Sequence, residues 1–330
     1  MPGMVGGFGN FFVPLLIGAV DMAKKREINK INKILIEQEV CSFNKDNNNN
    51  NNKFGSYLAG LFEGDGHIWI SSDYYTKKHN PRFNITFNLK DLPLAEMLLK
   101  EICLRTKIPK GFIRKKTRNN VCVLVLSNVE ILKYITVLIA PYIRTPKIEQ
   151  INKLINWINK KQNWNFSSLT ICKTSLDTDY WLAGFIDADG DFLIRYTTIS
   201  TELKERIGVT FRIEQRLLDP LSNISYEYIM LSIANFLQVK LNTRMQKKTG
   251  NQYWKITSSS KCSINILINY LNNYSLLSSK YLDYKDWEKI ASFFINDTHT
   301  LTENKKLILN LKNGMNNKRR IYTWNHLNIN

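Results

Sequence analysis

The sequence contains two carboxylates in matching surroundings. Residues 57–66 read YLAGLFEGDG and residues 181–190 read WLAGFIDADG, so Asp65 and Asp189 occupy the same place in two similar segments. Two carboxylates that meet repel each other, and a divalent cation between or beside them removes that repulsion. Because hard oxygen ligands favour Mg²⁺ over softer metals, we expect Asp65 and Asp189 to bind Mg²⁺.

Small residues in both segments predict two helices that pack closely side by side, which would bring the two aspartates together at the helix ends. Glycine inside a helix costs about 1 kcal/mol relative to alanine, and close packing of the backbones would offset that cost. One such aspartate alone would be an ordinary helix-end residue, but two in the same context favour a site. The small residues are Ala59, Gly60, Gly64, Ala183, Gly184 and Ala188.

The last residues of each segment are expected to complete the site. The backbone carbonyls of Gly64 and Ala188 are candidates for further metal ligands. Gly66 and Gly190 suit a chain that leaves a helix through a conformation that other residues resist.

Both segments resemble the LAGLIDADG motif of homing endonucleases, with one copy in each half of a single chain. The first copy departs from the motif at Phe62-Glu63-Gly64 and the second only at Phe185. The resemblance covers about residues 54–295. It implies an α+β fold of two pseudo-symmetric αββαββα halves, each with an antiparallel DNA-binding sheet, joined through the paired motif helices.

The resemblance also assigns roles within the motif. The eighth position, held by Asp65 and Asp189, supplies the metal-binding carboxylates. The sixth position, held by Glu63 and Asp187, is expected to cap or brace the helix ends.

Polar and apolar residues alternate after each motif, in residues 82–89 and 206–214, and predict antiparallel strands with one buried and one wet face. A two-stranded ribbon fits the major groove, where arginine can read guanine and asparagine or glutamine adenine. A solvated sheet would look similar in isolation. The expected DNA-facing residues are Trp69, Ser71, Asp73, Arg82, Asn84, Thr86, Asn88, Arg114, Lys116 and Arg118 in the first half, and Arg195, Thr197, Thr210, Arg212, Arg244, Gln246 and Lys248 in the second.

A lysine precedes the last helical segment of each half, Lys147 in the first and Lys280 in the second. The resemblance implies that these lysines help to order the attacking water and offset charge on the phosphate. With 46 lysines and arginines in the chain, a solvated lysine is the ordinary alternative.

Gln215 matches a family position that holds active-site water. The corresponding place in the first half, near Leu89 or Lys90, has no clear glutamine. We therefore expect two unequal centres, one of which cuts its DNA strand faster.

Composition limits the other possibilities. A net charge of +18 would attract phosphate backbones or anionic membranes. Five scattered cysteines (Cys41, Cys103, Cys122, Cys172 and Cys262) lack zinc or disulfide spacing, and we expect them to be reduced and mostly buried. Four scattered histidines, none of them noted near the motifs, fit a two-metal mechanism that needs no histidine base.

The ends of the chain differ from its middle. Residues 1–23 resemble a transmembrane segment of cytochrome oxidase subunit I, which indicates an exon fused to an intron reading frame and a mitochondrial location. Residues 24–53 are predicted to be a polar linker whose asparagine run, 47–52, should be disordered. The remaining predicted units are a first half, 54–165; a linker, 166–177; a second half, 178–295; and a tail, 296–330, whose basic residues touch phosphates or are disordered.

These features together favour a monomeric enzyme that binds double-stranded DNA without an obligate protein partner. The expected reaction is a Mg²⁺-dependent double-strand break in an intronless oxidase subunit I gene, which starts intron homing. Two alternatives stay open. One is an RNA maturase that binds its own intron RNA, and the other is a DNA binder without catalysis.

Overall fold

The structure is a computed structural model that describes residues 48–71, 79–197 and 206–327. The predicted exon-derived segment, 1–23, most of the predicted linker and Asp73 lie outside these ranges. Residues 52–330 form one compact unit. Within the described ranges, no helix has the length and apolar character needed to cross a membrane.

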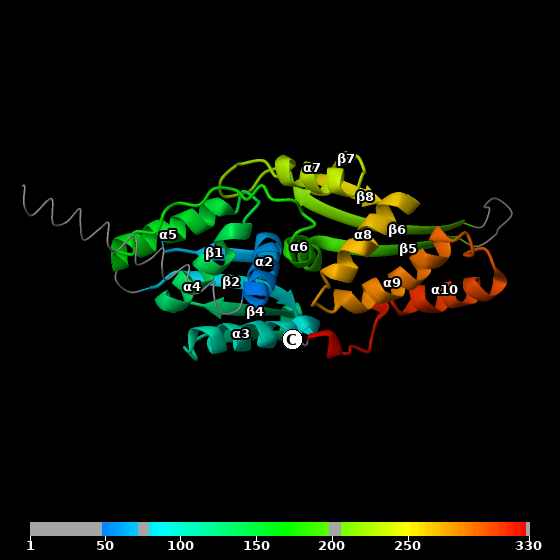
Figure 1. The fold of residues 1–330 in the computed structure, drawn as a ribbon. Coiled ribbons are helices and arrows are strands. Elements are labelled where there is room, and N and C mark those ends of the chain that lie inside the picture. Colours follow the sequence, from blue (N-terminus) through cyan, green and yellow to red (C-terminus); the bar gives the residue numbers. More distant parts are fainter. Residues whose placement is uncertain (1–47, 72–78, 198–205, 328–330) are drawn as a thin grey trace, which may run out of the picture. The chain divides into compact units, whose positions relative to one another are not determined.

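The first half contains one four-stranded sheet and four α-helices (Figure 1). Its elements are α2 (Asn48–Asp65), β1 (Gly66–Trp69), β2 (Arg82–Asn88), α3 (Leu92–Thr106), β3 (Phe112–Lys116), β4 (Val121–Leu126), α4 (Val129–Ile139) and α5 (Ile148–Gln162).

The second half repeats this order and is followed by an additional helix. Its elements are α6 (Trp181–Asp189), β5 (Gly190–Thr197), β6 (Arg206–Arg216), α7 (Glu227–Phe236), β7 (Leu241–Met245), β8 (Gln252–Ser258), α8 (Lys261–Asn273), α9 (Lys280–Ile295) and then α10 (Thr302–Gly314). The α+β prediction with two similar halves is confirmed. Each half nevertheless ends in two helices where one was expected, because Pro141 and Pro146 interrupt the helical segment between α4 and α5.

Both sheets are antiparallel and have the same strand order, β1-β2-β4-β3 and β5-β6-β8-β7. Gly66 pairs with Ile85 in the first sheet, and Gly190 pairs with Ile213 in the second. Since both pairings begin directly after the motif aspartate, the two registers can be superposed residue by residue. Apolar side chains from one face of each sheet pack against the helices, and the other face is open to solvent.

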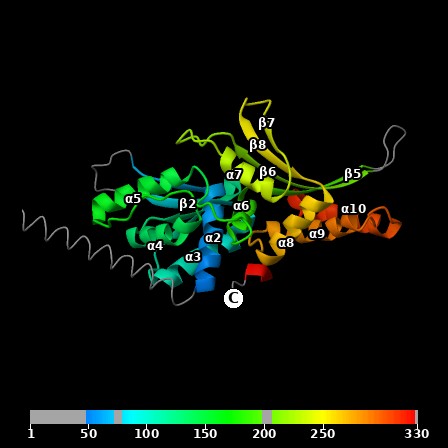
Figure 2. The ribbon, with the colours of Figure 1, turned by 45° about the horizontal axis from the view of Figure 1, so that its top comes forward.

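The motif helices α2 and α6 pack against each other (Figures 1 and 2). A Cβ atom on Gly60 would lie 1.9 Å from the carbonyl oxygen of Trp181, and one on Gly184 would lie 2.1 Å from that of Tyr57. These distances leave no room for a side chain. The predicted close approach of the two helices is therefore confirmed.

The glycines after the motifs serve packing and not an unusual backbone conformation. Gly190 has φ −82° and ψ 149°, which other residues adopt easily. A Cβ atom there would lie 2.9 Å from the carbonyl oxygen of Ile186, and one on Gly66 would lie 2.5 Å from that of Phe62. The expected conformational role was wrong.

The asparagine run is helical at its end and not disordered as predicted, because α2 begins at Asn48. Extending an anchored helix costs far less than nucleating one. The predicted linker has no helix or strand at 166–177, but it follows α5: Asn159 exchanges hydrogen bonds of 2.8 and 3.0 Å with the backbone of Phe166. Among the described cysteines only Cys122 is buried, so the expectation of mostly buried thiols was wrong.

The predicted basic tail is folded over much of its length. Helix α10 buries Ile308. Beyond it, Arg319 forms an ion pair with the buried Asp283, with 2.7 Å between Nε and Oδ1, and a second with Asp286. Arg319 therefore serves the fold, and the prediction of a phosphate contact or disorder does not apply to it.

Candidate active site

Asp65 and Asp189 end the two packed helices and lie close to both chains of the interface. A Cβ atom on Gly64 of the first helix would lie 3.2 Å from Oδ2 of Asp189. Loss of hydration raises the pKa of Asp189 to about 7, repulsion from Asp65 adds to the rise, and the two nearby lysines oppose it. The pKa of Asp65 is also raised by loss of hydration. The helix ends therefore hold two carboxyl groups that resist ionisation together.

The two predicted lysines reach these helix ends. Lys147, directly before α5, donates from Nζ to the carbonyl oxygens of Gly64 at 2.5 Å and Gly66 at 2.9 Å. Lys280, the first residue of α9, donates to the carbonyl oxygens of Ile186 at 2.9 Å and Ala188 at 3.3 Å. The lysines are thus not solvated surface residues. Each one stands beside the carboxylate that ends its own motif helix.

The sixth motif position fixes the loop that carries each lysine. Glu63 is buried and accepts hydrogen bonds from the backbone amides of Arg144 (3.0 Å) and Thr145 (2.5 Å). The amide of Lys147 in turn donates to Oγ1 of Thr145 at 3.2 Å. Glu63 therefore braces the start of another helix, α5, and not the end of its own.

The second half repeats this arrangement. Asp187 is buried and accepts from the amides of Leu277 (2.7 Å) and Ser278 (3.1 Å) and from Oγ of Ser278 (2.5 Å). The amide of Lys280 donates to Oγ of Ser278 at 3.1 Å. Burial raises the pKa of both Glu63 and Asp187, and the hydrogen bonds oppose that rise.

Gln215 joins the second centre, as predicted. Its Nε2 donates to Oδ2 of Asp189 at 3.0 Å. The superposed registers place Phe87 at the equivalent position of the first sheet, not Leu89 or Lys90 as expected. Phe87 is buried and carries no polar group, so the first centre lacks this amide.

The DNA-facing residues predicted for the first sheet lie on its open face. The cross-strand register puts His67 opposite Asn84 and Trp69 opposite Arg82, with 5.0 Å between the Arg82 guanidinium and the Trp69 ring. The remaining predicted residues of this half are exposed or half-buried: Ser71, Thr86, Asn88, Arg114, Lys116 and Arg118. Of these, Arg118 lies beyond the end of β3, in the turn 117–119.

The predicted residues of the second sheet share one face in the same way. Those on strands are Arg195, Thr197, Thr210, Arg212 and Arg244. Gln246 and Lys248 lie beyond the end of β7, in the turn before β8, and were wrongly placed on the strand. The Oε1 atom of Gln246 accepts from Oγ1 of Thr249 at 3.1 Å, so this side chain is used within the turn.

The model of a known family matches both halves. The model described as LAGLIDADG endonuclease matches residues 58–158 and again residues 182–291. The chain belongs to the LAGLIDADG endonuclease family. The two matches coincide with the two copies of the site.

Two curated relatives of this LAGLIDADG chain come from yeasts. The protein of Saccharomyces cerevisiae named intron-encoded DNA endonuclease aI3 is 32% identical over 359 residues, which cover 99% of this chain and 81% of that protein. A Schizosaccharomyces pombe protein named an uncharacterized cox1 intron-2 37.2 kDa protein is 30% identical over 258 residues, which cover 77% of this chain and 70% of that protein.

Solved structures show the same fold. The meganuclease I-SmaMI bound to uncleavable DNA superposes with a TM-score of 0.60 at 20% identity, covering 80% of this chain and 99% of that one. I-SmaMI bound to an uncleaved DNA target in the presence of calcium ions superposes with a TM-score of 0.57 at 21% identity, covering 79% of this chain and 98% of that one.

Several residues near the LAGLIDADG site were missed in the sequence. His67 is exposed on β1, two positions after Asp65, which contradicts the expectation of no histidine near the motifs. Loss of hydration and the charge of Lys147 lower its pKa. Its position directly after the motif was the signal that could have identified it.

Two acidic residues also lie on the open face of the second sheet. Arg212 pairs with Asp191 at 2.7 Å, and Arg244 pairs with Glu214 at 2.5 Å. Sequence reasoning named only the arginines of these pairs. The acceptors were visible as alternate residues on the same strands, but their cross-strand partners were not.

Proposed function

We propose that the chain is an intron-encoded endonuclease that cuts both strands of a DNA target, one strand at each of the two centres. The observation that carries the proposal is the duplicated geometry of Asp65 with Lys147 and Asp189 with Lys280. A structural role would not require the same carboxylate, lysine and bracing acid twice at one interface. The names of the yeast relative and the DNA-bound neighbours support a DNA substrate.

The carboxylates of Asp65 and Asp189 are proposed to hold Mg²⁺. Two hard oxygen donors whose ionisation is suppressed by mutual repulsion fit a divalent cation, because the cation relieves that repulsion. Among the described residues no group of three or more His, Cys, Asp or Glu side chains offers another metal site. Calcium accompanies one structural neighbour, which is consistent with a cation that prefers oxygen ligands.

The backbone carbonyls of Gly64 and Ala188 have other partners than those expected from the sequence. They accept from the ammonium groups of Lys147 and Lys280. An ammonium group repels a cation, so we now assign the metal to the carboxylates and these carbonyls to holding the lysines. Each lysine is then fixed at the end of its motif helix.

Hydrolysis of a phosphodiester needs an aligned water and compensation of charge on the phosphate. When bound, Mg²⁺ would act as a Lewis acid and make a nucleophile from water. The chain would supply the rest: Lys147 and Lys280 place positive charge beside the phosphate, and the amide of Gln215 orients water next to Asp189. The open faces of the two sheets would bind the DNA on either side.

The proposed target is the fused exon junction of an intronless oxidase subunit I gene, reached in the mitochondrion. Its support is the resemblance of residues 1–23 to subunit I and the S. pombe relative, which is named for a cox1 intron. Cleavage there would start intron homing. The chain is proposed to act as a monomer, because both centres are built from one polypeptide.

The test is cleavage of a plasmid that carries the fused junction, with Mg²⁺, by the unmodified protein and by Asp65→Asn and Asp189→Asn. Linear product from the unmodified protein alone is expected. Tight binding of the junction without any product would indicate a DNA binder without catalysis. Weak binding there together with tight binding to the intron transcript would indicate a maturase.

A further inference from the structure

The two bracing carboxylates, Glu63 and Asp187, also receive hydrogen bonds from the opposite half. The hydroxyl of Tyr57, in the first half, donates to Oδ2 of Asp187 at 2.7 Å. Nε1 of Trp181, in the second half, donates to Oε2 of Glu63 at 2.6 Å. Tyr57 and Trp181 hold the same position in their motifs, so the exchange between halves is reciprocal.

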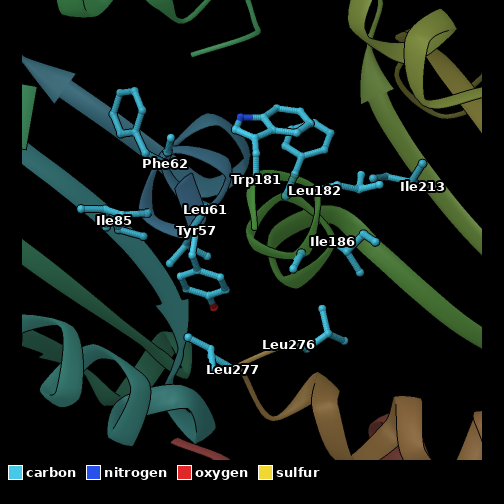
Figure 3. Packing of buried hydrophobic residues seen from close by; sticks show 14 of the residues in the cluster. Tyr57, Leu61, Phe62, Ile85, Trp181, Leu182, Ile186, Ile213, Leu276 and Leu277 are labelled. Carbon is cyan, nitrogen blue, oxygen red and sulfur yellow. The ribbon is translucent and has the colours of Figure 1, made fainter. Parts of the chain in front are cut away.

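The four groups are completely enclosed by protein. Tyr57 and Trp181 belong to the buried core, and Glu63 is 0% exposed and Asp187 7% exposed. Figure 3 shows the two aromatic side chains pointing to opposite sides of the helix pair, with Tyr57 directed toward the segment of Leu276 and Leu277. A buried carboxylate that loses a donor cannot replace it with water at little cost.

A continuous series of hydrogen bonds connects each aromatic residue with the lysine of the opposite half. Tyr57 donates to Asp187, and Asp187 accepts from the amide and hydroxyl of Ser278. The hydroxyl of Ser278 in turn accepts from the amide of Lys280. In the other direction, Trp181 donates to the carboxylate that holds the loop before Lys147.

We propose that Tyr57 and Trp181 are positioning residues that act across the helix interface. Tyr57 sets the position of Lys280 through Asp187, and Trp181 sets that of Lys147 through Glu63. The inference rests on the catalytic role proposed above for the two lysines. It means that each half completes the active centre of the other half.

A second contact supports the first half in this role. Oδ1 of Asp91 accepts from the amide of Ser279, directly before Lys280, at 2.7 Å. The superposed registers make Asp219 its equivalent in the second half. The residue that Asp219 would hold is Pro146, which has no amide hydrogen. Oδ2 of Asp219 accepts instead from the amide of Ser222, in its own loop, at 2.8 Å.

The test measures the nicking rate of each strand separately on a target labelled on both strands. Lys147→Met and Lys280→Met first establish which strand belongs to which centre. Tyr57→Phe keeps the ring and removes the hydroxyl. We expect it to slow the Lys280 strand about tenfold, as for the loss of one hydrogen bond to a charged group, and to leave the Lys147 strand within about twofold.

A matched control and a second variant guard against general damage. Tyr142 belongs to the same half, and its hydroxyl donates to Oδ1 of Asn52 at 2.9 Å, so Tyr142→Phe removes a hydrogen bond far from Asp187 in the chain of contacts. It should change neither strand. Asp91→Ala should slow the same strand as Tyr57→Phe, because both residues hold the loop before Lys280.

The pH profile separates positioning from a merely structural effect. The hydroxyl of Tyr57 lowers the pKa of Asp187, so its removal raises that pKa further. In Tyr57→Phe the acidic limb of the Lys280 strand should therefore move to higher pH, while that of the Lys147 strand stays in place.

Equal slowing of both strands by Tyr57→Phe, or slowing of the Lys147 strand alone, would overturn the inference. If neither Lys→Met variant slows a strand, the proposed catalytic role fails, and the inference fails with it. If the Lys→Met variants act on separate strands but Tyr57→Phe changes nothing, only the coupling between halves is wrong.

Discussion

Nε2 of Gln215 donates a 3.0 Å hydrogen bond to Oδ2 of Asp189, and the equivalent position of the first sheet holds the buried Phe87. Only one of the two centres therefore has a side-chain amide beside its aspartate. Lys147 also donates to three carbonyl oxygens, while Lys280 donates to two among the described residues. One N–H of Lys280 is left to face water or substrate.

This inequality predicts that the unmodified enzyme nicks one strand faster than the other. Gln215→Leu should slow the strand cut at the Asp189 centre by about tenfold and bring the two rates closer together. Gln162→Leu, an exposed position at the end of α5, is the matched control. Equal rates for the two nicks of a supercoiled plasmid would contradict the prediction.

Substitution of Asp189 should trade activity for stability. Its folded-state pKa, about 7, lies above the ordinary value of 3.8, so ionisation costs stability. That cost is absent at low pH and develops as the pH rises through both values. Without metal, Asp189→Asn should abolish cleavage and raise the free energy of unfolding by roughly 1–3 kcal/mol at pH 8, with little gain at pH 4. Thermal unfolding at both pH values measures this. Asp191→Asn, at an exposed position, should show no such gain.

The close approach of α2 and α6 should not tolerate any side chain on the interface glycines. In Gly184→Ala the new Cβ would lie 2.1 Å from the carbonyl oxygen of Tyr57 and 2.8 Å from the amide of Leu61. The helices must separate to accept it, at a cost of about 3 kcal/mol or more. Denaturant unfolding should show this loss, and Gly314→Ala, where nothing lies within 4 Å of the added atom, should show almost none.

Arg319 should contribute to stability and not to DNA affinity. Arg319→Ala leaves Asp283, whose side chain is 4% exposed, without its charged partner. We expect a loss of about 3 kcal/mol in unfolding free energy, because a buried charge without its partner is costly. Arg320→Ala, at the exposed neighbouring position, should be neutral for stability. A drop in DNA affinity with unchanged stability would return Arg319 to the expected phosphate-binding tail.

The parts of the site that depend on local spacing could be predicted from the sequence. Asp65 and Asp189 were found because their motif repeats, and Lys147 and Lys280 because both stand before a helix. The equivalence of Gln215 with Phe87 was missed because the segments between the paired strands differ in length, so counting along the chain shifts the register.

Contacts between the halves could not be predicted in this way. Tyr57 and Trp181 look like ordinary core residues in the sequence, and both are indeed buried. Their polar atoms acquire partners only when α2 and α6 cross. Likewise, Asp91 precedes Ser279 by most of the chain, and no local pattern relates a carboxylate to an amide at that separation.

The exchanged hydrogen bonds constrain how halves of such enzymes can be recombined. The longer reach of the Tyr57 hydroxyl meets the shorter side chain of Asp187, and the shorter reach of the Trp181 indole meets the longer side chain of Glu63. A chimaera that joins two copies of the second half would face tryptophan with aspartate, and one that joins two first halves would crowd tyrosine against glutamate. Grafting a half from one homing enzyme onto another therefore requires that its donor and acceptor lengths be matched together with its DNA specificity.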